Sequence, residues 1–154
     1  MIRIEAIDLP VSSVLAQGAA VEDYLDCFAF QQPRAIGLGE FVAAFYATPL
    51  FRLERAVLAL VLKRWVRDRE VVALAQGAEQ FAVWRVIYRD ADQILLEDRS
   101  GATRSWLAVE DQRLLFGSGV RARGGQLSLS VRLLLPLHRA YARALLRAAV
   151  RRLG

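Results

Sequence analysis

Residues 80–134 read QFAVWRVIYRDADQILLEDRSGATRSWLAVEDQRLLFGSGVRARGGQLSLSVRLL. Apolar and polar residues alternate in five segments of this stretch, a pattern typical of half-buried strands. The short runs between the segments contain Asp, Ser and Gly, which turns favour. Five strands joined by short turns predict an antiparallel sheet. The predicted strands are Gln80–Tyr88, Gln93–Glu97, Thr103–Val109, Arg113–Ala122 and Gln126–Leu134.

A helix is predicted to follow the last strand, from Pro136 to Leu153. Arginine recurs at every fourth position from Arg139 to Arg151, which places these charges along one side of a helix. Leu137 and Tyr141 fall on the other side, and we expect them to face the sheet. The predicted helix therefore has a basic face in water and an apolar face in the core.

The residues before the sheet contribute strands and helices of their own. The aromatic-rich segment from Asp23 to Phe30 predicts a strand that ends before Pro33, and Ile2–Ile7 predicts a short strand or an extended arm. Between Gly39 and Ala75, apolar residues recur at steps of three and four, which predicts two or three helices. Pro49 separates the first two of these helices, with Thr48 as an N-cap.

The composition supports one α+β domain over residues 1–154. The chain is 55% apolar and 24% charged, which is enough apolar material for a single core. No linker, repeat or low-complexity tract divides it. The longest purely apolar run, Ala56–Leu62, is far shorter than the roughly 20 residues that span a bilayer. With no secretory signal pattern at the N-terminus, we expect a cytoplasmic protein without a membrane span.

Charge and rare residues restrict the chemistry. The net charge of +5 favours an anionic partner only weakly, and no aromatic and basic strand motif for nucleic acid is present. Cys27 is the only cysteine and His138 the only histidine, so an intrachain disulfide and the usual zinc ligand sets cannot form. We expect no metal, no cofactor and no catalytic triad.

The order of the predicted elements indicates where a site would lie. An antiparallel sheet with one apolar face must bury that face, and the C-terminal helix is available to cover it. A curved sheet around a helix leaves a space between the two layers, and that space is the expected site.

Two short motifs resemble a family of bacterial domains in the helix-grip superfamily, which includes START domains, polyketide cyclases and birch-pollen-type allergens. Residues 23–28 (DYLDCF) are similar to the aromatic strand of that family, and residues 135–141 (LPLHRAY) are similar to the start of its last helix. The resemblance implies a curved antiparallel sheet wrapped around a long C-terminal helix. Some members look like extensions of short-chain dehydrogenases, but residues 37–42 (GLGEFV) lack the third glycine of a dinucleotide loop.

Two residues are candidates for acid or base chemistry. Histidine changes its charge near neutral pH, so His138 could transfer a proton; the alternative is that it locks the helix onto the sheet by a hydrogen bond. Asp26 shares a strand face with Tyr24 and Phe28. If this face points inward, Asp26 is a buried carboxylate, for which we expect an arginine partner: Arg85, Arg104 or Arg121.

Aromatic side chains could line a pocket, although an aromatic stripe is more often plain core. Trp84 and Tyr88 share one strand face, and Trp106 shares another with Arg104. The Arg104 and Trp106 face is the better candidate, because a purely structural core would not need the arginine.

The sequence favours a binding domain over an enzyme. The expected ligand is a small apolar or amphipathic molecule held between the sheet and the C-terminal helix. One alternative is a cyclase-like or hydrolase-like enzyme that uses His138 or Asp26. The other is a docking module whose arginine face binds a protein partner, such as a dehydrogenase. A homodimer is a separate expectation for the partners of the chain. The predicted ligand-binding residues are Tyr24, Asp26, Arg104, Trp106, His138 and Tyr141.

Overall fold

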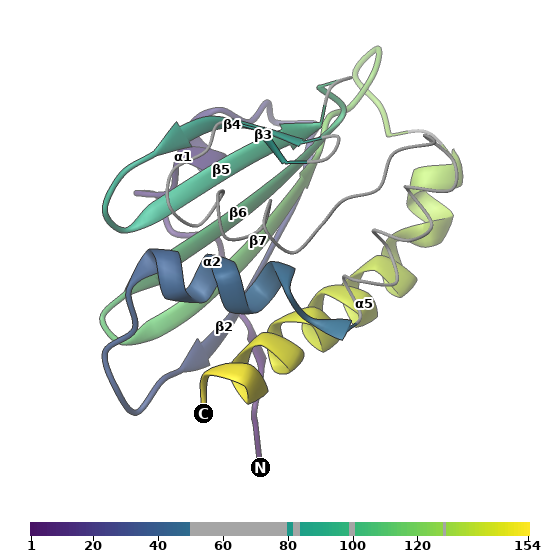
Figure 1. Cartoon of the computed structure of the whole chain (residues 1–154). Helices are drawn as coiled ribbons and strands as arrows, with labels where there is room; N and C mark the ends of the chain where they lie inside the picture. The colour runs from purple at the N-terminus through teal and green to yellow at the C-terminus, as the bar shows by residue number, and fades with distance from the viewer. Residues whose placement is uncertain (50–79, 82–83, 99–100, 128) are drawn as a thin grey trace.

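A computed structural model describes residues 1–49, 80–81, 84–98, 101–127 and 129–154. Within these residues, seven antiparallel strands form one sheet, and the helices α2 and α5 lie across one of its faces (Figure 1). This arrangement confirms the α+β class and the placement of the C-terminal helix. The strands are β1 (Glu5–Ala6), β2 (Tyr24–Gln31), β3 (Gln80–Phe81), β4 (Trp84–Arg89), β5 (Gln93–Asp98), β6 (Thr103–Glu110) and β7 (Arg113–Val120).

The strand order is β1-β2-β7-β6-β5-β4-β3. Strands β4 to β7 form the predicted meander, in which each strand pairs with the next one along the chain. The prediction of one continuous strand over Gln80–Tyr88 is wrong, because β3 and β4 are separate strands that pair antiparallel, with Phe81 opposite Trp84. The early strand β2 then pairs along its whole length with β7, so that Asp26 lies opposite Ser118. Because β7 has β2 on one side and β6 on the other, it is an interior strand of the sheet.

The predicted strand Gln126–Leu134 is wrong. Helix α5 runs from Leu129 to Leu153 and contains Pro136 within it. Alternating leucine and serine suggested a strand, but both edges of β7 are already paired, so a strand directly after it has no neighbour to bond. In the helix, the side chains that pack on the core include Ala142, Leu145, Leu146 and Ala149.

Alternation along the strands gives the sheet two buried faces. One face packs under α2 (Leu38–Tyr46) and α5, and its core includes Phe28, Leu107 and Phe116. The other face carries a smaller core that forms around Leu15 and Trp106. The two cores lie on opposite faces of the sheet, so a cavity under α5 would leave the core around Leu15 and Trp106 packed.

A short helix that the sequence analysis missed covers the second face. Helix α1 (Val14–Gln17) follows Ser13, whose hydroxyl accepts a hydrogen bond from the amide of Ala16 at 3.0 Å. Such an N-cap satisfies one of the amides that a helix start leaves unpaired. Leu15 projects from this helix into the smaller core and is fully buried.

Helix α2 confirms the start of the predicted helical region. It begins one residue before Gly39 and ends at Tyr46, with Phe41 and Phe45 buried. The further helices predicted up to Ala75, and the proposed capping of the second one by Thr48, depend on residues outside the described part of the chain. Among the described residues, no helix has the length and apolarity needed to cross a bilayer.

Candidate functional site

Tyr24, Asp26 and His138 meet where the first half of α5 crosses β2. The Tyr24 hydroxyl donates a hydrogen bond to Oδ2 of Asp26 at 2.8 Å, and Nε2 of His138 lies 3.5 Å from the same oxygen. The rings of Tyr24 and His138 approach edge to face, with centroids 6.2 Å apart. These three side chains, which we call the carboxylate cluster, join the strand to the helix.

The sheet supplies the other partner of Asp26. Its Oδ1 accepts a hydrogen bond from the amide of Ser118 on β7 at 2.9 Å. The Asp26 side chain is only 5% exposed, so these donors are what allows a polar group to be buried here. The strand alternation of β2 explains the placement, because Tyr24 and Asp26 are two residues apart and share a face.

Tyr24 remains a donor over an unusually wide pH range. Burial, the hydrogen bond to Asp26 and the charge of that carboxylate raise the pKa of Tyr24 far above its ordinary value, and only Arg139 acts against them. The phenol is therefore protonated at neutral pH, and it stabilises the buried carboxylate.

His138 has hydrogen-bonding capacity that the described residues do not use. Its Nε2 is buried and makes no hydrogen bond to them, although Oδ2 of Asp26 lies 3.5 Å away. The side chain as a whole is 33% exposed. His138 therefore lies at the boundary between the interior and solvent.

A cavity of about 240 Å³ opens beside His138, between the sheet and α5. Most of its wall is apolar, although the hydroxyls of Tyr46 and Ser105 also line it and lie 3.1 Å apart. The described apolar side chains in its wall are Phe45, Trp84, Phe116, Val120, Tyr141 and Leu145.

Four of the six predicted ligand-binding residues lie together. Tyr24, Asp26 and His138 form the carboxylate cluster, and Tyr141 lines the adjacent cavity one turn further along α5. Leu137, which was expected to face the sheet, is 69% exposed, so that part of the prediction is wrong. The helix is rotated so that His138 rather than Leu137 points inward.

The structure separates Arg104 and Trp106 from this group. Trp106 is buried in the core under α1, where its indole N–H donates to Oε1 of Gln93 at 2.9 Å. The backbone of Arg104 borders the cavity, but its guanidinium extends to the carbonyl oxygen of Gly18, 2.9 Å away. Their strand face therefore points away from α5.

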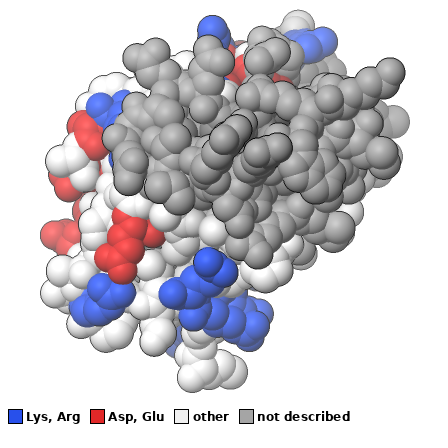
Figure 2. Space-filling view, viewed as in Figure 1, with Lys and Arg blue, Asp and Glu red and all other residues white. Residues whose placement is uncertain are grey.

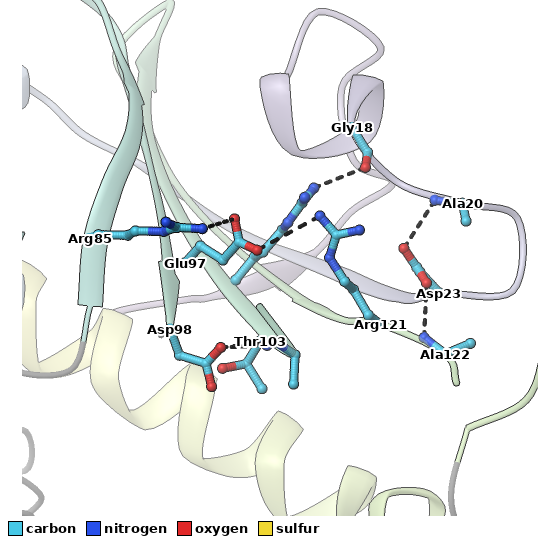
Figure 3. A network of polar contacts seen from close by, with 11 residues as sticks. Gly18, Ala20, Asp23, Arg85, Glu97, Asp98, Thr103, Arg121 and Ala122 are labelled. Carbon is cyan, nitrogen blue, oxygen red and sulfur yellow. Dashed lines mark hydrogen bonds and ion pairs between the residues drawn. The ribbon is translucent and has the colours of Figure 1, made fainter. Parts of the chain in front are cut away.

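The arginines proposed as partners of Asp26 surround a different carboxylate. Glu97 is nearly buried on the α1 side of the sheet, with Arg121 at 3.8 Å and Arg85 at 4.0 Å (Figure 3). Arg104 pairs across the strands with Glu97 in the sheet register. The prediction of an arginine partner for Asp26 is thus wrong, since histidine, tyrosine and a backbone amide take that role.

Sequence reasoning missed Tyr46, Ser105 and Ser118 at the site. Tyr46 ends α2 and lies beside Ser105 of β6 only because the helix packs over that strand. Alternation along β6 and β7 would have placed Ser105 and Ser118 on the same face as Phe116, had the inward face been known. The pairing of β2 with β7, which places Asp26 opposite Ser118, would have identified that face, but it cannot be read from the sequence pattern.

The chemistry of the site is hydrogen bonding at the edge of an apolar space. In the described parts of the chain, no group of three His, Cys, Asp or Glu side chains is placed to hold a metal ion. Asp26 could orient the His138 imidazole, and the imidazole could donate or accept a hydrogen bond from a molecule in the cavity. Comparison with protein-family models, curated proteins and solved structures gave no match to this chain.

Proposed function

We propose that the protein binds a small, mostly apolar molecule in the cavity between the sheet and α5. The observation that carries this proposal is the position of His138: its side chain lines an apolar cavity, and its buried Nε2, 3.5 Å from Asp26, has no hydrogen-bond partner among the described residues. Ligand pockets commonly combine apolar walls with a few placed polar groups. The apolar part of the ligand contacts Phe116 and Leu145, and its polar end contacts His138.

The volume and the charges narrow the ligand class. A cavity of about 240 Å³ exceeds the roughly 150 Å³ apolar cavity that accommodates benzene. It is smaller than the 300 Å³ or so at which pockets for drug-sized molecules begin. A carboxylate on the ligand would approach Asp26 and be repelled, so a neutral hydroxyl is the favoured polar group. A substituted phenol meets these conditions.

Isothermal titration calorimetry with 4-propylphenol tests the proposal, with 4-propylbenzoate as the charged comparison. The phenol is expected to bind and the benzoate to bind at least tenfold more weakly. Val120→Phe, which fills part of the cavity, is expected to abolish phenol binding. Val109→Phe is the matched control, because Val109 packs against the same core but does not line this cavity.

Three outcomes would contradict the proposal. The first is that neither probe raises the melting temperature or gives a heat of binding. The second is that Val120→Phe and Val109→Phe bind the phenol as the unchanged protein does. The third is that both variants lose binding equally while remaining folded by circular dichroism, which would place the phenol elsewhere.

The contact between Asp26 and His138 also supports a second proposal, that the site catalyses a proton transfer. A carboxylate that orients an imidazole is a recurrent arrangement in acid and base catalysis. No described hydroxyl or thiol is bonded to His138, so nucleophilic catalysis is the less favoured form. Under this proposal, His138→Gln abolishes turnover of a bound phenol or ester, whereas under the binding proposal it only weakens affinity.

A further inference from the structure

Four leucines on the first half of α5 project into solvent. Leu129, Leu133 and Leu137 are about 70% exposed, and Leu134 beside them is 58% exposed. We call these four residues the leucine ridge. The first three recur every fourth position, so they follow one side of the helix over about 12 Å. Single exposed apolar residues are ordinary on proteins, but a contiguous group usually marks a contact surface.

The charged residues of α5 all have one sign. From Leu129 to the C-terminus the chain holds six arginines and no Asp or Glu. In the described parts of the chain, none of the six forms an ion pair with a carboxylate; Arg143 instead stacks over the ring of Phe28, 5.3 Å from its centroid. Figure 2 shows basic side chains gathered where the later turns of α5 reach this face of the molecule.

Three of these arginines lie directly beside the leucine ridge. Arg132, Arg139 and Arg143 line one side of a shallow groove of about 430 Å³, together with Tyr24 and Pro136. On a helix, positions 132, 139 and 143 cluster on one flank, whereas positions 129, 133 and 137 lie next to that flank. The surface thus pairs an apolar strip with a strip of arginines that form no ion pair with the described carboxylates.

We propose that this half of α5 docks on the surface of an anionic lipid bilayer. The leucine ridge enters the boundary between headgroups and acyl chains, while the arginines contact lipid phosphates. A second copy of the chain is a poorer occupant, because two such helices would bring their arginines together. An acidic protein would pair with the arginines. To cover the leucines as well, it would also have to offer an apolar groove of matching shape, whereas a bilayer provides both an anionic surface and an apolar interior.

None of the ridge leucines lines the cavity under α5, so the docking surface is separate from the proposed ligand site. Failure of one proposal therefore leaves the other intact. The two surfaces share the helix that carries them, and Tyr24 both lines the groove and belongs to the carboxylate cluster.

Vesicle flotation tests the docking surface. The protein is expected to float with vesicles of phosphatidylcholine mixed with phosphatidylglycerol, and not with vesicles of phosphatidylcholine alone. Leu133→Glu combined with Leu137→Glu is expected to lower the partition coefficient more than tenfold. Its matched control is Val11→Glu combined with Val21→Glu, which changes two apolar residues that are even more exposed but lie elsewhere in the chain.

A second pair of variants tests the arginines. Arg132→Glu combined with Arg139→Glu is expected to lower binding at least twentyfold, because a basic residue near an anionic surface contributes about fivefold in affinity. Arg151→Glu combined with Arg152→Glu makes the same change of charge at the far end of the helix, and this variant is expected to lose much less of its binding to anionic vesicles.

The result that overturns the proposal is equally specific. The docking surface is wrong if the unchanged protein ignores the anionic vesicles, or if both control pairs lose as much binding as the ridge and flank variants. If the ridge and flank variants instead lose only the capture of an acidic protein, the occupant is that protein and the membrane proposal fails. Circular dichroism of every variant establishes that α5 remains folded.

Discussion

His138 Nε2 lies 3.5 Å from Asp26 Oδ2, and this contact fixes the first half of α5 against the second strand of the sheet. Asp26 also accepts two hydrogen bonds, from the Tyr24 hydroxyl and the Ser118 amide, whereas the His138 contact is not a hydrogen bond. The carboxylate thus connects a helix with two neighbouring strands. Removing the Asp26 carboxylate should therefore lower the free energy of unfolding more than removing any one of its partners.

Asp26→Ala is expected to lower the free energy of unfolding by about 2–4 kcal/mol, since it leaves buried donors without acceptors. His138→Gln keeps a polar side chain at the helix and leaves the hydrogen bonds of Asp26 in place, so about 0.5–1.5 kcal/mol is expected. Urea denaturation at neutral pH measures both. An equal cost for the two variants would mean that Asp26 acts only through His138.

Tyr24→Phe and Tyr88→Phe form a matched pair. Each tyrosine donates to Oδ2 of an aspartate two residues later, at 2.8 and 2.9 Å, but Tyr24 is partly buried and Tyr88 is exposed. Tyr24→Phe should cost about 1–2 kcal/mol because its hydrogen bond satisfies a buried charged group. Tyr88→Phe should cost less than about 0.5 kcal/mol, as exposed substitutions usually do. Chemical denaturation distinguishes these values, and the reverse order would contradict the assigned role of Tyr24.

Cys27 should give the stability a measurable dependence on alkaline pH. Burial, aided by the charge of Asp26, raises the pKa of its thiol from 9.0 to about 12. Between these two values the thiol ionises in the unfolded chain but stays protonated in the folded one. This contribution is therefore complete below pH 9 and is lost as the pH rises towards 12.

Comparison of the unchanged protein with Cys27→Ala isolates this effect, because the other titrating groups are common to both. The difference in unfolding free energy between the two should shift in favour of Cys27→Ala above pH 9. The native thiol should also react with Ellman's reagent only after unfolding, since Cys27 is 2% exposed. Fast labelling of the native protein would contradict its burial.

Glu97 and Glu110 compare a nearly buried carboxylate with an exposed one. Glu97 lies 3.8 and 4.0 Å from two arginines and its side chain is 10% exposed, whereas Glu110 lies 2.9 Å from Arg113 and is 38% exposed. Glu97→Gln is expected to cost about 1–3 kcal/mol, because it leaves the surrounding arginines without compensation. Glu110→Gln is expected to cost less than about 1 kcal/mol despite the shorter distance. Thermal unfolding at low and high salt provides the measurement, and a larger cost at Glu110 would show that distance outweighs burial here.

Gly117→Ala and Gly37→Ala test packing on the second face of the sheet. A methyl group on Gly117 would lie 3.0 Å from the Trp106 ring and 3.1 Å from both the Asp26 carbonyl and Leu15. Such crowding is expected to cost about 1–3 kcal/mol. At Gly37, the N-cap of α2, the same methyl group meets no atom within 4 Å, so the cost should stay below about 1 kcal/mol and come only from the less favoured cap residue. Similar melting temperatures for both variants would mean that Trp106 and Leu15 can move aside.

The fold was predictable where the pattern was local. Alternation predicted β2 and the meander from β4 to β7, and steps of three and four predicted the start of α2, but alternation did not reveal that residues 80–88 belong to two paired strands. The segment after residue 126 misled because Leu129 and Val131 alternate with polar residues as strand residues do. Only the pairing of β7 on both edges excludes that strand, and this pairing joins segments far apart in sequence.

The site was predictable in part for the same reason. Tyr24 and Asp26 share a face by alternation alone, and His138 is the only imidazole in the chain. Arg104 and Trp106 share a face too, but nothing local shows whether that face meets α5 or α1. The sequence also could not predict that Glu97 is nearly buried beside arginines, since these arginines come from other parts of the sheet.

The position of β7 in the interior of the sheet has a consequence for folding during synthesis. Strand β2 carries Phe28 and other core residues, yet its main partner, β7, is complete only at Val120. The ribosome therefore releases an apolar strand well before the chain contains its neighbour. Long-range pairing of this kind slows folding and leaves apolar segments exposed to aggregation or chaperones. Yield in the cell should accordingly depend on how quickly translation proceeds from β2 to β7.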